Sequence, residues 1–293
     1  MPTPSSCSRS RSRCARCRAV SSIKCARRCC LGKDGVHEGR RHFESVAASY
    51  GTARPPYPTV LYETLAQQGV IGPDLRVLEI GPGSGEATGE LVRRGSKVVA
   101  VEPGPELADR LRRECPDATV VVSRLEDMDM AARQFDSVVA ATSMHWVDLP
   151  TMLPKLGQAL EPRGMLAVWR TVFGDPRVRT PFRQAVDKIV AGRGTSVPRS
   201  DPLDPRPTVE ELEAGGRFRH IRSWQWPWQI DLDALQVRAL FTTFSDWRDP
   251  GELDAVQAAA AAQPGSVTEH YVTILHLLRG TTGEKDAVRE GPY

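Results

Sequence analysis

The stretch Val77-Leu78-Glu79-Ile80-Gly81-Pro82-Gly83-Ser84-Gly85 decides the fold of this chain. Residues 76–80 form a short apolar run that is typical of a buried strand, and three glycines follow it closely. Glycine lets the backbone turn sharply and approach a bound ligand where a Cβ atom would clash. The stretch therefore predicts a strand, then a ligand-binding turn at Gly81, Gly83 and Gly85, then a helix over residues 86–94.

Short β-branched runs alternate with helical patterns over most of the remaining chain. The further predicted strands span residues 97–101, 118–122, 135–141, 165–169, 220–229 and 270–279. The further predicted helices span residues 105–114, 150–160, 181–191, 209–214, 233–243 and 252–262. This alternation predicts an α/β fold with a doubly wound, seven-stranded and mostly parallel sheet, followed by late helical insertions.

An acidic residue comes directly after the second predicted strand. Glu102 lies 17 residues beyond Gly85, so its carboxylate is placed at the tip of that strand, in reach of two ribose hydroxyls. The glycines are spaced G-x-G-x-G, whereas a nicotinamide dehydrogenase has G-x-G-x-x-G, and Glu86 stands at the third glycine's position. An acid at a helix start repels phosphate. The pattern favours an adenosine ligand without a pyrophosphate over an NAD(P)-dependent oxidoreductase, and a non-catalytic adenosine-binding protein stays open as an alternative.

Two segments of unlike composition contribute to the net charge of +3. Residues 1–42 contain eleven Lys or Arg and two acids, whereas the remainder carries 28 basic and 34 acidic residues. An acidic body disfavours a broad nucleic-acid surface, which needs clustered positive charge. No apolar run approaches the ~20 residues of a membrane span. We therefore expect neither nucleic acid nor a membrane as a partner.

Residues 1–40 are rich in Ser, Arg and Cys and show no amphipathic period, which predicts a disordered extension. Six of the seven cysteines lie within the first thirty residues, so disulfides cannot link the strands and helices of the body. We therefore expect reduced cysteines and a cytoplasmic location. We expect no metal site in the body. A zinc knuckle on Cys14, Cys17, Cys25 and Cys29 and an organellar transit peptide are alternatives for the extension. The predicted organisation is an extension over 1–40, one domain over 41–280 and a flexible tail over 281–293.

Five motifs in order resemble those of the class I S-adenosylmethionine-dependent methyltransferases, over residues 43–279. They span residues 78–85, 101–103, 123–127, 135–141 and 160–166. The resemblance implies an enzyme that transfers a methyl group from S-adenosyl-L-methionine, and it assigns the cofactor to Glu79, Gly81, Gly83, Gly85, Glu102, Pro103, Leu125, Glu126 and Ala141. Arg124 stands where the adenine-side loop often carries an acid, so either Glu126 or the backbone of Leu125 is expected to contact the adenine.

The segment before the glycine turn carries a narrower resemblance. The chain resembles small-molecule methyltransferases similar to trans-aconitate methyltransferase at two places. One is Phe43, Tyr50 and the run Arg54-Pro-Pro-Tyr-Pro58, and the other is His145 and Trp146 after the fourth strand. This resemblance implies an N-terminal helical lid over the cofactor, with Tyr50 and Arg54 near its methionine carboxylate, where Arg supplies a planar charged fork.

A nucleic-acid methyltransferase is the alternative enzyme. Its Asp/Asn-Pro-Pro-Tyr loop follows the fourth strand and accepts a hydrogen bond from the target amine. Here that position holds Thr142-Ser-Met-His-Trp146, and the Pro-Pro-Tyr run follows Arg54, which is a donor. We therefore expect a small-molecule acceptor that is methylated on a carboxylate or hydroxyl oxygen. We expect the chain to act as a monomer or homodimer.

His145 is the candidate catalytic residue. A hydroxyl acceptor needs a general base, whereas a carboxylate is already ionised at neutral pH. His145 is expected beside the transferred methyl group, where its ordinary pKa of ~6.5 would suit a base. In the alternative interpretation, His145 and Trp146 bind the acceptor by shaping its pocket.

Three tryptophans, Trp224, Trp226 and Trp228, share one face of a predicted strand. They are expected either to form an aromatic wall for the acceptor or to pack against the sheet.

Overall fold

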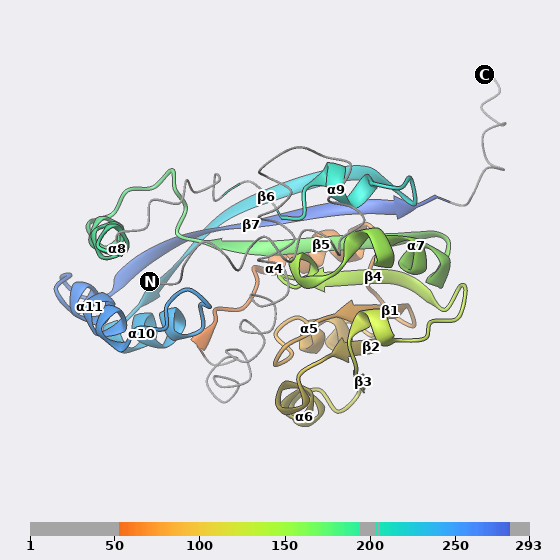
Figure 1. Ribbon diagram of the computed structural model, residues 1–293, viewed down its shortest axis with the longest axis horizontal. Coiled ribbons are helices and arrows are strands. Elements are labelled where there is room, and N and C mark those ends of the chain that lie inside the picture. Colours follow the sequence, from red (N-terminus) through yellow and green to blue (C-terminus); the bar gives the residue numbers. More distant parts are fainter. Residues whose placement is uncertain (1–52, 194–202, 204–205, 282–293) are drawn as a thin grey trace, which may run out of the picture. The chain divides into compact units, whose positions relative to one another are not determined.

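The computed structural model describes residues 53–193, 203 and 206–281 (Figure 1). Their seven strands form one sheet in the order β3-β2-β1-β4-β5-β7-β6. The strands are β1 (Arg76–Ile80), β2 (Lys97–Glu102), β3 (Thr119–Val122), β4 (Phe135–Ala141), β5 (Leu160–Phe173), β6 (Phe218–Leu232) and β7 (Val267–Gly280). The predicted extension, Phe43, Tyr50 and residues 282–293 of the predicted tail lie outside the described residues.

Strand direction confirms the predicted doubly wound, mostly parallel sheet. Strands β1 to β5 pair in parallel, whereas β7 pairs antiparallel with both β5 and β6. From β1, the chain adds β2 and β3 on one side and then returns to add β4 on the other. Ligands of open α/β sheets bind beyond the carboxyl ends of the strands at such a reversal. A ligand-binding site is therefore expected at the carboxyl ends of β1 and β4.

The described helices are α4 (Thr59–Gln67), α5 (Thr88–Arg93), α6 (Pro105–Glu114), α7 (Leu149–Ala159), α8 (Pro181–Ala191), α9 (Val209–Glu213), α10 (Ala234–Thr242) and α11 (Pro250–Ala261), with 3₁₀ turns η3 (Leu125–Asp127) and η4 (Met144–Trp146). Side-chain caps begin four of them. Thr180, Thr208, Asp233 and Asp249 each accept a hydrogen bond from a backbone N–H in the first turn of α8 to α11.

Apolar side chains cover both faces of the sheet, as expected for parallel strands with helices on each side. On one face, α4, α5 and α6 pack against β1, β2 and β4, and on the other, α7 and α9 pack against the same sheet. A third cluster joins α8, α10 and α11 with the far ends of β6 and β7. In Figure 1 these three helices lie at one end of the sheet, past the ends of β1 to β4.

The structure corrects the predicted bounds of four elements, namely α5, β5, β6 and β7. Helix α5 begins at Thr88, so Glu86 lies in the turn before the helix and not at its start. Strand β5 begins at Leu160 and not at residue 165, because the ladder with β4 continues across a register shift: Phe135 pairs with Leu160 but Ser137 pairs with Met165. Strands β6 and β7 are also longer than predicted, because they pair with each other over almost their whole length.

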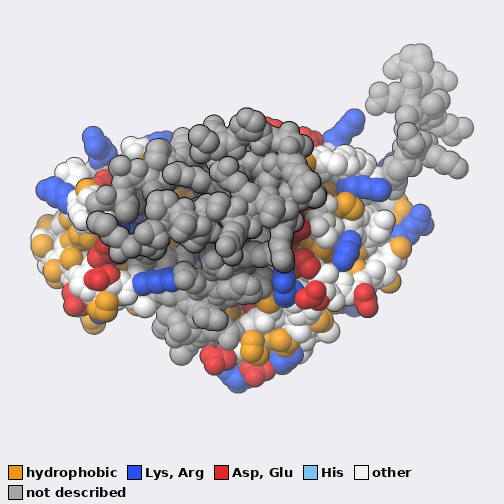
Figure 2. All heavy atoms as spheres, in the orientation of Figure 1, with side chains coloured by type: hydrophobic (Ala, Val, Ile, Leu, Met, Phe, Trp, Pro, Cys, Tyr) orange, Lys and Arg blue, Asp and Glu red, His pale blue; other side chains and the backbone are white. Residues whose placement is uncertain are grey.

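Charge is mixed over the surface. Figure 2 shows Lys and Arg side chains interspersed with Asp and Glu on the visible part of the described chain. A nucleic-acid surface would gather basic side chains into a patch or stripe. Among the described residues, no helix has the length and apolar composition needed to cross a bilayer.

Candidate functional site

The glycine turn lies between β1 and α5, at the reversal of the strand order. Gly81 has a φ of 60°, and a Cβ there would lie 2.8 Å from the Cβ of Ser143. Gly85 has a φ of 101°, and a Cβ there would lie 2.7 Å from Cδ1 of Leu111. These two glycines are therefore required by close packing within the protein itself. Gly83 uses its backbone N–H, which donates to Oε2 of Glu102 over 3.1 Å.

Glu102 ends β2 beside this turn and is 6% exposed. Its Oε1 accepts a hydrogen bond from the backbone N–H of Gly104 over 2.8 Å, while Oε2 accepts the one from Gly83. The carboxylate thus positions the glycine turn. Pro103, the next residue, is half-buried.

Glu79 is the most deeply buried acid of the site. It points from β1 beneath the turn, is fully buried, and accepts a hydrogen bond at Oε2 from the hydroxyl of Thr88 over 2.7 Å. Its Oε1 has no hydrogen-bond partner in the described part of the chain. Burial is the main cause that raises the pKa of Glu79 to about 8, and the negative charges of Glu86 and Glu102 add to it. A buried oxygen of this kind calls for a hydrogen-bond partner, because an unsatisfied polar atom is costly.

The predicted adenine-side residues lie after β3 and at the end of β4. Leu125 is buried in η3, whereas Glu126 and Ala141 are half-buried. Oε2 of Glu126 lies 3.4 Å from Nε of Arg124, and its Oε1 accepts a hydrogen bond from the backbone N–H of Asp148. The carboxylate of Glu126 is therefore held between Arg124 and the start of α7. Its contact with a ligand stays a prediction.

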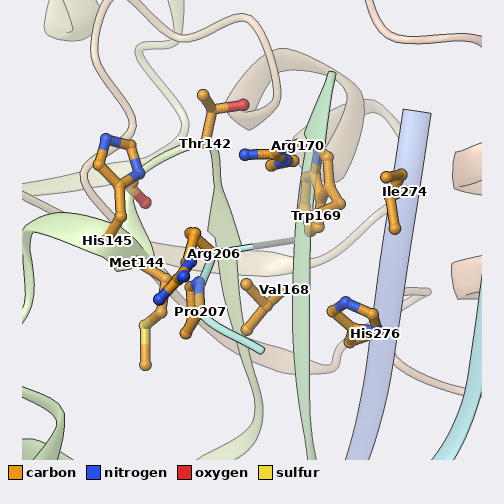
Figure 3. A pocket seen from close by; sticks show the side chains of 11 residues that line it. Thr142, Met144, His145, Val168, Trp169, Arg170, Arg206, Pro207, Ile274 and His276 are labelled. Atoms are coloured by element: carbon orange, nitrogen blue, oxygen red, sulfur yellow. The ribbon is translucent and has the colours of Figure 1, made fainter. Parts of the chain in front are cut away.

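A shallow, half-open pocket lies next to the glycine turn, and its empty space of about 270 Å³ includes open solvent. Its lining is Thr142, Ser143, Met144, His145, Val168, Trp169, Arg170, Arg206, Pro207, Ile274 and His276 (Figure 3). We call it the Ser143 pocket, because Ser143 forms its shared wall with the turn. The Ser143 hydroxyl donates to the carbonyl of Ile80, and its Cβ packs against Gly81. A molecule in this pocket therefore lies beside whatever the glycine turn binds.

Nitrogen-bearing side chains dominate the polar lining of the Ser143 pocket. Arg170, Arg206, His145 and His276 line it, and none of the described lining residues is acidic. Arg206 also pairs with Glu211 at 3.6 Å, so part of its charge is balanced. A cavity with this lining favours a negatively charged or oxygen-rich ligand over a cation.

His145 lies in η4 after β4, as predicted, and lines the Ser143 pocket. Desolvation by surrounding protein is the main cause that lowers its pKa to about 4, and the charges of Arg170 and Arg54 lower it further. The side chain is exposed, so water partly offsets these effects. His145 is therefore neutral at neutral pH. Trp146 packs against the His145 ring, with centroids 4.7 Å apart, and is not among the residues that line the pocket.

Arg54 contacts the late helices. Its Nε donates to the hydroxyl and its Nη2 to the carbonyl of Thr243, each over 3.2 Å. The guanidinium also lies over the rings of Phe173 and Phe244, 5.3 and 5.5 Å from their centroids. The predicted contact of Arg54 with a cofactor carboxylate stays a prediction, and Tyr50 lies outside the described residues.

The tryptophan stripe of β6 faces away from the Ser143 pocket. Trp224 pairs with Leu275 on β7, and Trp224 and Trp226 pack against the core cluster on the other face of the sheet. Trp228 packs edge-on against Tyr271, with ring centroids 5.0 Å apart, and donates to the hydroxyl of Thr273 over 2.9 Å. These contacts are those of sheet packing.

The structure adds pocket residues that the sequence analysis did not select. Arg170 directly follows the predicted strand 165–169, and a charged residue at the carboxyl end of a parallel strand is a usable signal. Thr142 also lines the pocket; it has a φ of 57°, and its hydroxyl lies 3.0 Å from that of Tyr57. Such strained residues cluster at functional sites. Arg206 and His276 gave no comparable signal, since one lies in an irregular segment and the other in an apolar strand.

Several known proteins are similar to this chain in sequence or in fold. The family described as "Methyltransferase domain" matches residues 78–168. An uncharacterized methyltransferase of Mycobacterium tuberculosis is 35% identical over 244 residues, which cover 79% of this chain and 93% of the relative. An uncharacterized methyltransferase-like protein of Schizosaccharomyces pombe is 27% identical over 205 residues, which cover 69% of this chain and 77% of the relative. A structure assigned as a type II methyltransferase of Anaeromyxobacter dehalogenans superimposes with a TM-score of 0.59 at 23% identity, covers 77% of this chain and 97% of that chain, and so shares its fold.

Proposed function

The chain belongs to the S-adenosylmethionine-dependent methyltransferases, and from this premise we propose that it methylates an oxygen atom of a small anionic acceptor bound in the Ser143 pocket. A carboxylate is favoured over a hydroxyl as the methylated group. One observation carries the proposal: a pocket lined by Arg170, Arg206 and two histidines, and by no described acid, shares Ser143 with the glycine turn.

The residues around the turn fit the cofactor. Glu102 is a buried acid at the carboxyl end of β2, beside the glycine turn, which is where a carboxylate would accept hydrogen bonds from two ribose hydroxyls. Oε1 of Glu79 is a buried polar atom without a partner among the described residues, and the positive charge of the ligand's ammonium group would favour the ionised carboxylate that accepts from it. When bound, S-adenosylmethionine supplies a methyl group already activated on a positively charged sulfur. Leu125, Glu126, Pro103 and Ala141 would border its adenosine.

The protein's own contribution is alignment. Methyl transfer is an in-line displacement, and holding two reactants in the right geometry supplies much of the lowering of the barrier. Ser143 ties η4 to the end of β1 through the Ile80 carbonyl, so it sets the spacing between the glycine turn and the pocket. Arg170 follows the buried strand segment 166–169, which gives its charge a rigid support opposite that wall.

We favour a carboxylate over a hydroxyl as the methylated group because the two differ in protonation at neutral pH. A carboxylate reaches the pocket ionised at neutral pH and needs no general base. Arg170 and Arg206 would attract such an anion and repel an ammonium group. A hydroxyl would need a base, and the lowered pKa of His145 leaves it neutral but a weak proton acceptor. His145 therefore serves better to shape the pocket than to remove a proton.

A ligand screen tests this proposal. The protein loaded with S-adenosylhomocysteine would be screened by thermal shift against small carboxylates, phenols and amines, and hits would be assayed for methyl-ester formation. We expect carboxylates to raise the melting temperature, and Arg170→Gln to weaken their binding at least tenfold with cofactor affinity unchanged. Arg112→Gln is the matched control, because Arg112 pairs with Asp109 on the outer surface of α6.

Two results would contradict the proposal. Selective stabilisation by amines would show that the pocket accepts cations. Carboxylate affinities that fall equally in Arg170→Gln and Arg112→Gln would show that Arg170 does not contact the acceptor.

A further inference from the structure

Three polar side chains form a hydrogen-bonded chain from the Ser143 pocket to the edge of the sheet. Nδ1 of His276 on β7 lies 2.6 Å from the hydroxyl oxygen of Ser223 on β6. The same oxygen lies 2.8 Å from Nε2 of His220. His276 is 6% exposed and lines the pocket, and its Nε2 has no hydrogen-bond partner among the described residues. A buried polar atom in a pocket lining is a candidate ligand contact.

A β-bulge brings this chain together. Ser223 pairs with His276 and His220 pairs with Leu278, so all three polar side chains lie on the same face of the sheet. Residues 220 and 223 are three apart, and in a regular strand their side chains would point to opposite faces. The register shifts between His220 and Arg222, which leaves Ile221 as the extra residue and returns His220 to the pocket face.

The charges around His276 keep its ring neutral. Burial is the main cause that lowers its pKa, and His220 from β6 and Arg170 from β5 lower it further. Glu210 from α9 acts in the opposite direction. Arg206 and His145 line the same pocket and add no negative charge. A neutral imidazole has one N–H and one bare nitrogen, and a hydrogen bond at one nitrogen decides which is which.

We propose that His276 is a specificity residue for the methyl acceptor, and that its Nε2–H donates a hydrogen bond to a second anionic group of that molecule. Ser223 acts as a positioning residue: its hydroxyl donates to Nδ1 of His276 and accepts from His220, so the N–H of His276 lies on Nε2. The inference rests on the proposed function. It narrows the acceptor from a carboxylate to a molecule with two anionic ends.

The residues that line the pocket are arranged so that an acceptor with two anionic ends could contact both sides of it. His145 comes from η4 after β4, His276 comes from β7, and β5 lies between these strands in the sheet. In Figure 3 His145 and His276 lie on opposite sides of the pocket, with Val168 and Arg206 between them. His145 lies two residues after Ser143, whose Cβ packs against Gly81 of the glycine turn. One end of the acceptor would thus lie at the reacting side, and the other end at His276.

Two four-carbon probes test the inference. Butyrate and succinate differ by one carboxylate, and their affinities for the full chain loaded with S-adenosylhomocysteine can be measured by calorimetry. We expect succinate to bind at least tenfold more tightly than butyrate, since a hydrogen bond to a charged group is worth at least that factor. His276→Phe should abolish the preference, His276→Gln should keep most of it because the amide still donates, and Ser223→Ala should reduce it. His270→Gln on the same strand, outside the described lining of the pocket, is the control.

A spectroscopic readout separates recognition from a merely structural role. Long-range ¹H–¹⁵N NMR of the wild-type protein should show His276 protonated on Nε2, and Ser223→Ala should mix the two tautomers. S-adenosylhomocysteine affinity should stay within twofold in every variant, which shows that the fold is intact. The inference is overturned by a proton on Nδ1, or by a preference for succinate that survives His276→Phe.

The test also distinguishes this inference from the function on which it rests. If both probes bind equally and both depend on Arg170, the anionic acceptor stands and the role of His276 is refuted. If neither probe binds, both proposals fail together.

Discussion

Replacing Glu102 by alanine removes the carboxylate on which both the glycine turn and the predicted ribose contact depend. In the ligand-free protein the backbone N–H groups of Gly83 and Gly104 lose their acceptor. Each such loss near a buried position costs about 1–3 kcal/mol, less where water can enter. We therefore expect Glu102→Ala to lower the free energy of unfolding by about 1–3 kcal/mol in total.

The effect on the cofactor should be larger than one neutral hydrogen bond. Two ribose hydroxyls donating to a charged acceptor are each worth about 1.5–3 kcal/mol, and partial replacement by water leaves about 2–4 kcal/mol. That difference corresponds to a loss of about 30- to 700-fold in affinity for S-adenosylmethionine. Glu102→Gln keeps one acceptor oxygen but brings an NH₂ group against a backbone N–H, so we expect an intermediate loss.

Isothermal titration calorimetry with S-adenosylmethionine, paired with thermal denaturation, measures both effects. Glu106→Ala is the matched control, because Glu106 is an exposed acid in the first turn of α6. A dissociation constant for Glu102→Ala within threefold of wild type would refute the ribose contact. Binding of NADH in place of S-adenosylmethionine would refute the whole interpretation of the turn.

Four further predictions are open to direct measurement. Gly83→Val should abolish S-adenosylmethionine binding while circular dichroism shows a folded sheet, since its φ of 62° and close ligand approach both exclude a branched side chain; wild-type affinity would contradict this. His145→Gln should lower turnover less than tenfold and keep the pH profile, whereas the loss of a general base would cost about 10²–10⁴-fold and remove the fall in rate on acidification. Glu79→Gln should raise the melting temperature of the ligand-free protein more at pH 8 than at pH 5, because the folded state keeps Glu79 protonated up to about pH 8 while the unfolded chain ionises earlier; equal shifts at both pH values would argue against the raised pKa. Deleting residues 1–36 should leave melting temperature and turnover unchanged, as their composition predicts, and stoichiometric zinc lost together with stability would show the opposite.

Local chemistry made much of the fold predictable. A strand, a glycine turn and a helix follow each other within residues 76–93, and their pattern depends only on neighbours in the chain. The same holds for Glu102, because an acid at the end of the next parallel strand must lie at the same sheet edge as the turn. The prediction was wrong about the start of α5, since the turn takes up residues 83–87 before the first helical residue, Thr88.

The Ser143 pocket could not be predicted in the same way. It joins Ser143, Arg170, Arg206 and His276, which lie on four separate segments of the chain. They meet because β7 inserts between β5 and β6, a pairing that depends on contacts about a hundred residues apart.

Amino-acid order alone therefore determined the strands, the turn and the acid that point to the cofactor, because each follows from the local backbone preferences of a few consecutive residues. Only the tertiary structure decided which polar side chains face the acceptor. A strand's alternation does not tell which face is which, and one extra residue at Ile221 exchanges the faces on either side of it. That single bulge places His220 beside Ser223 and connects both to the buried ring of His276.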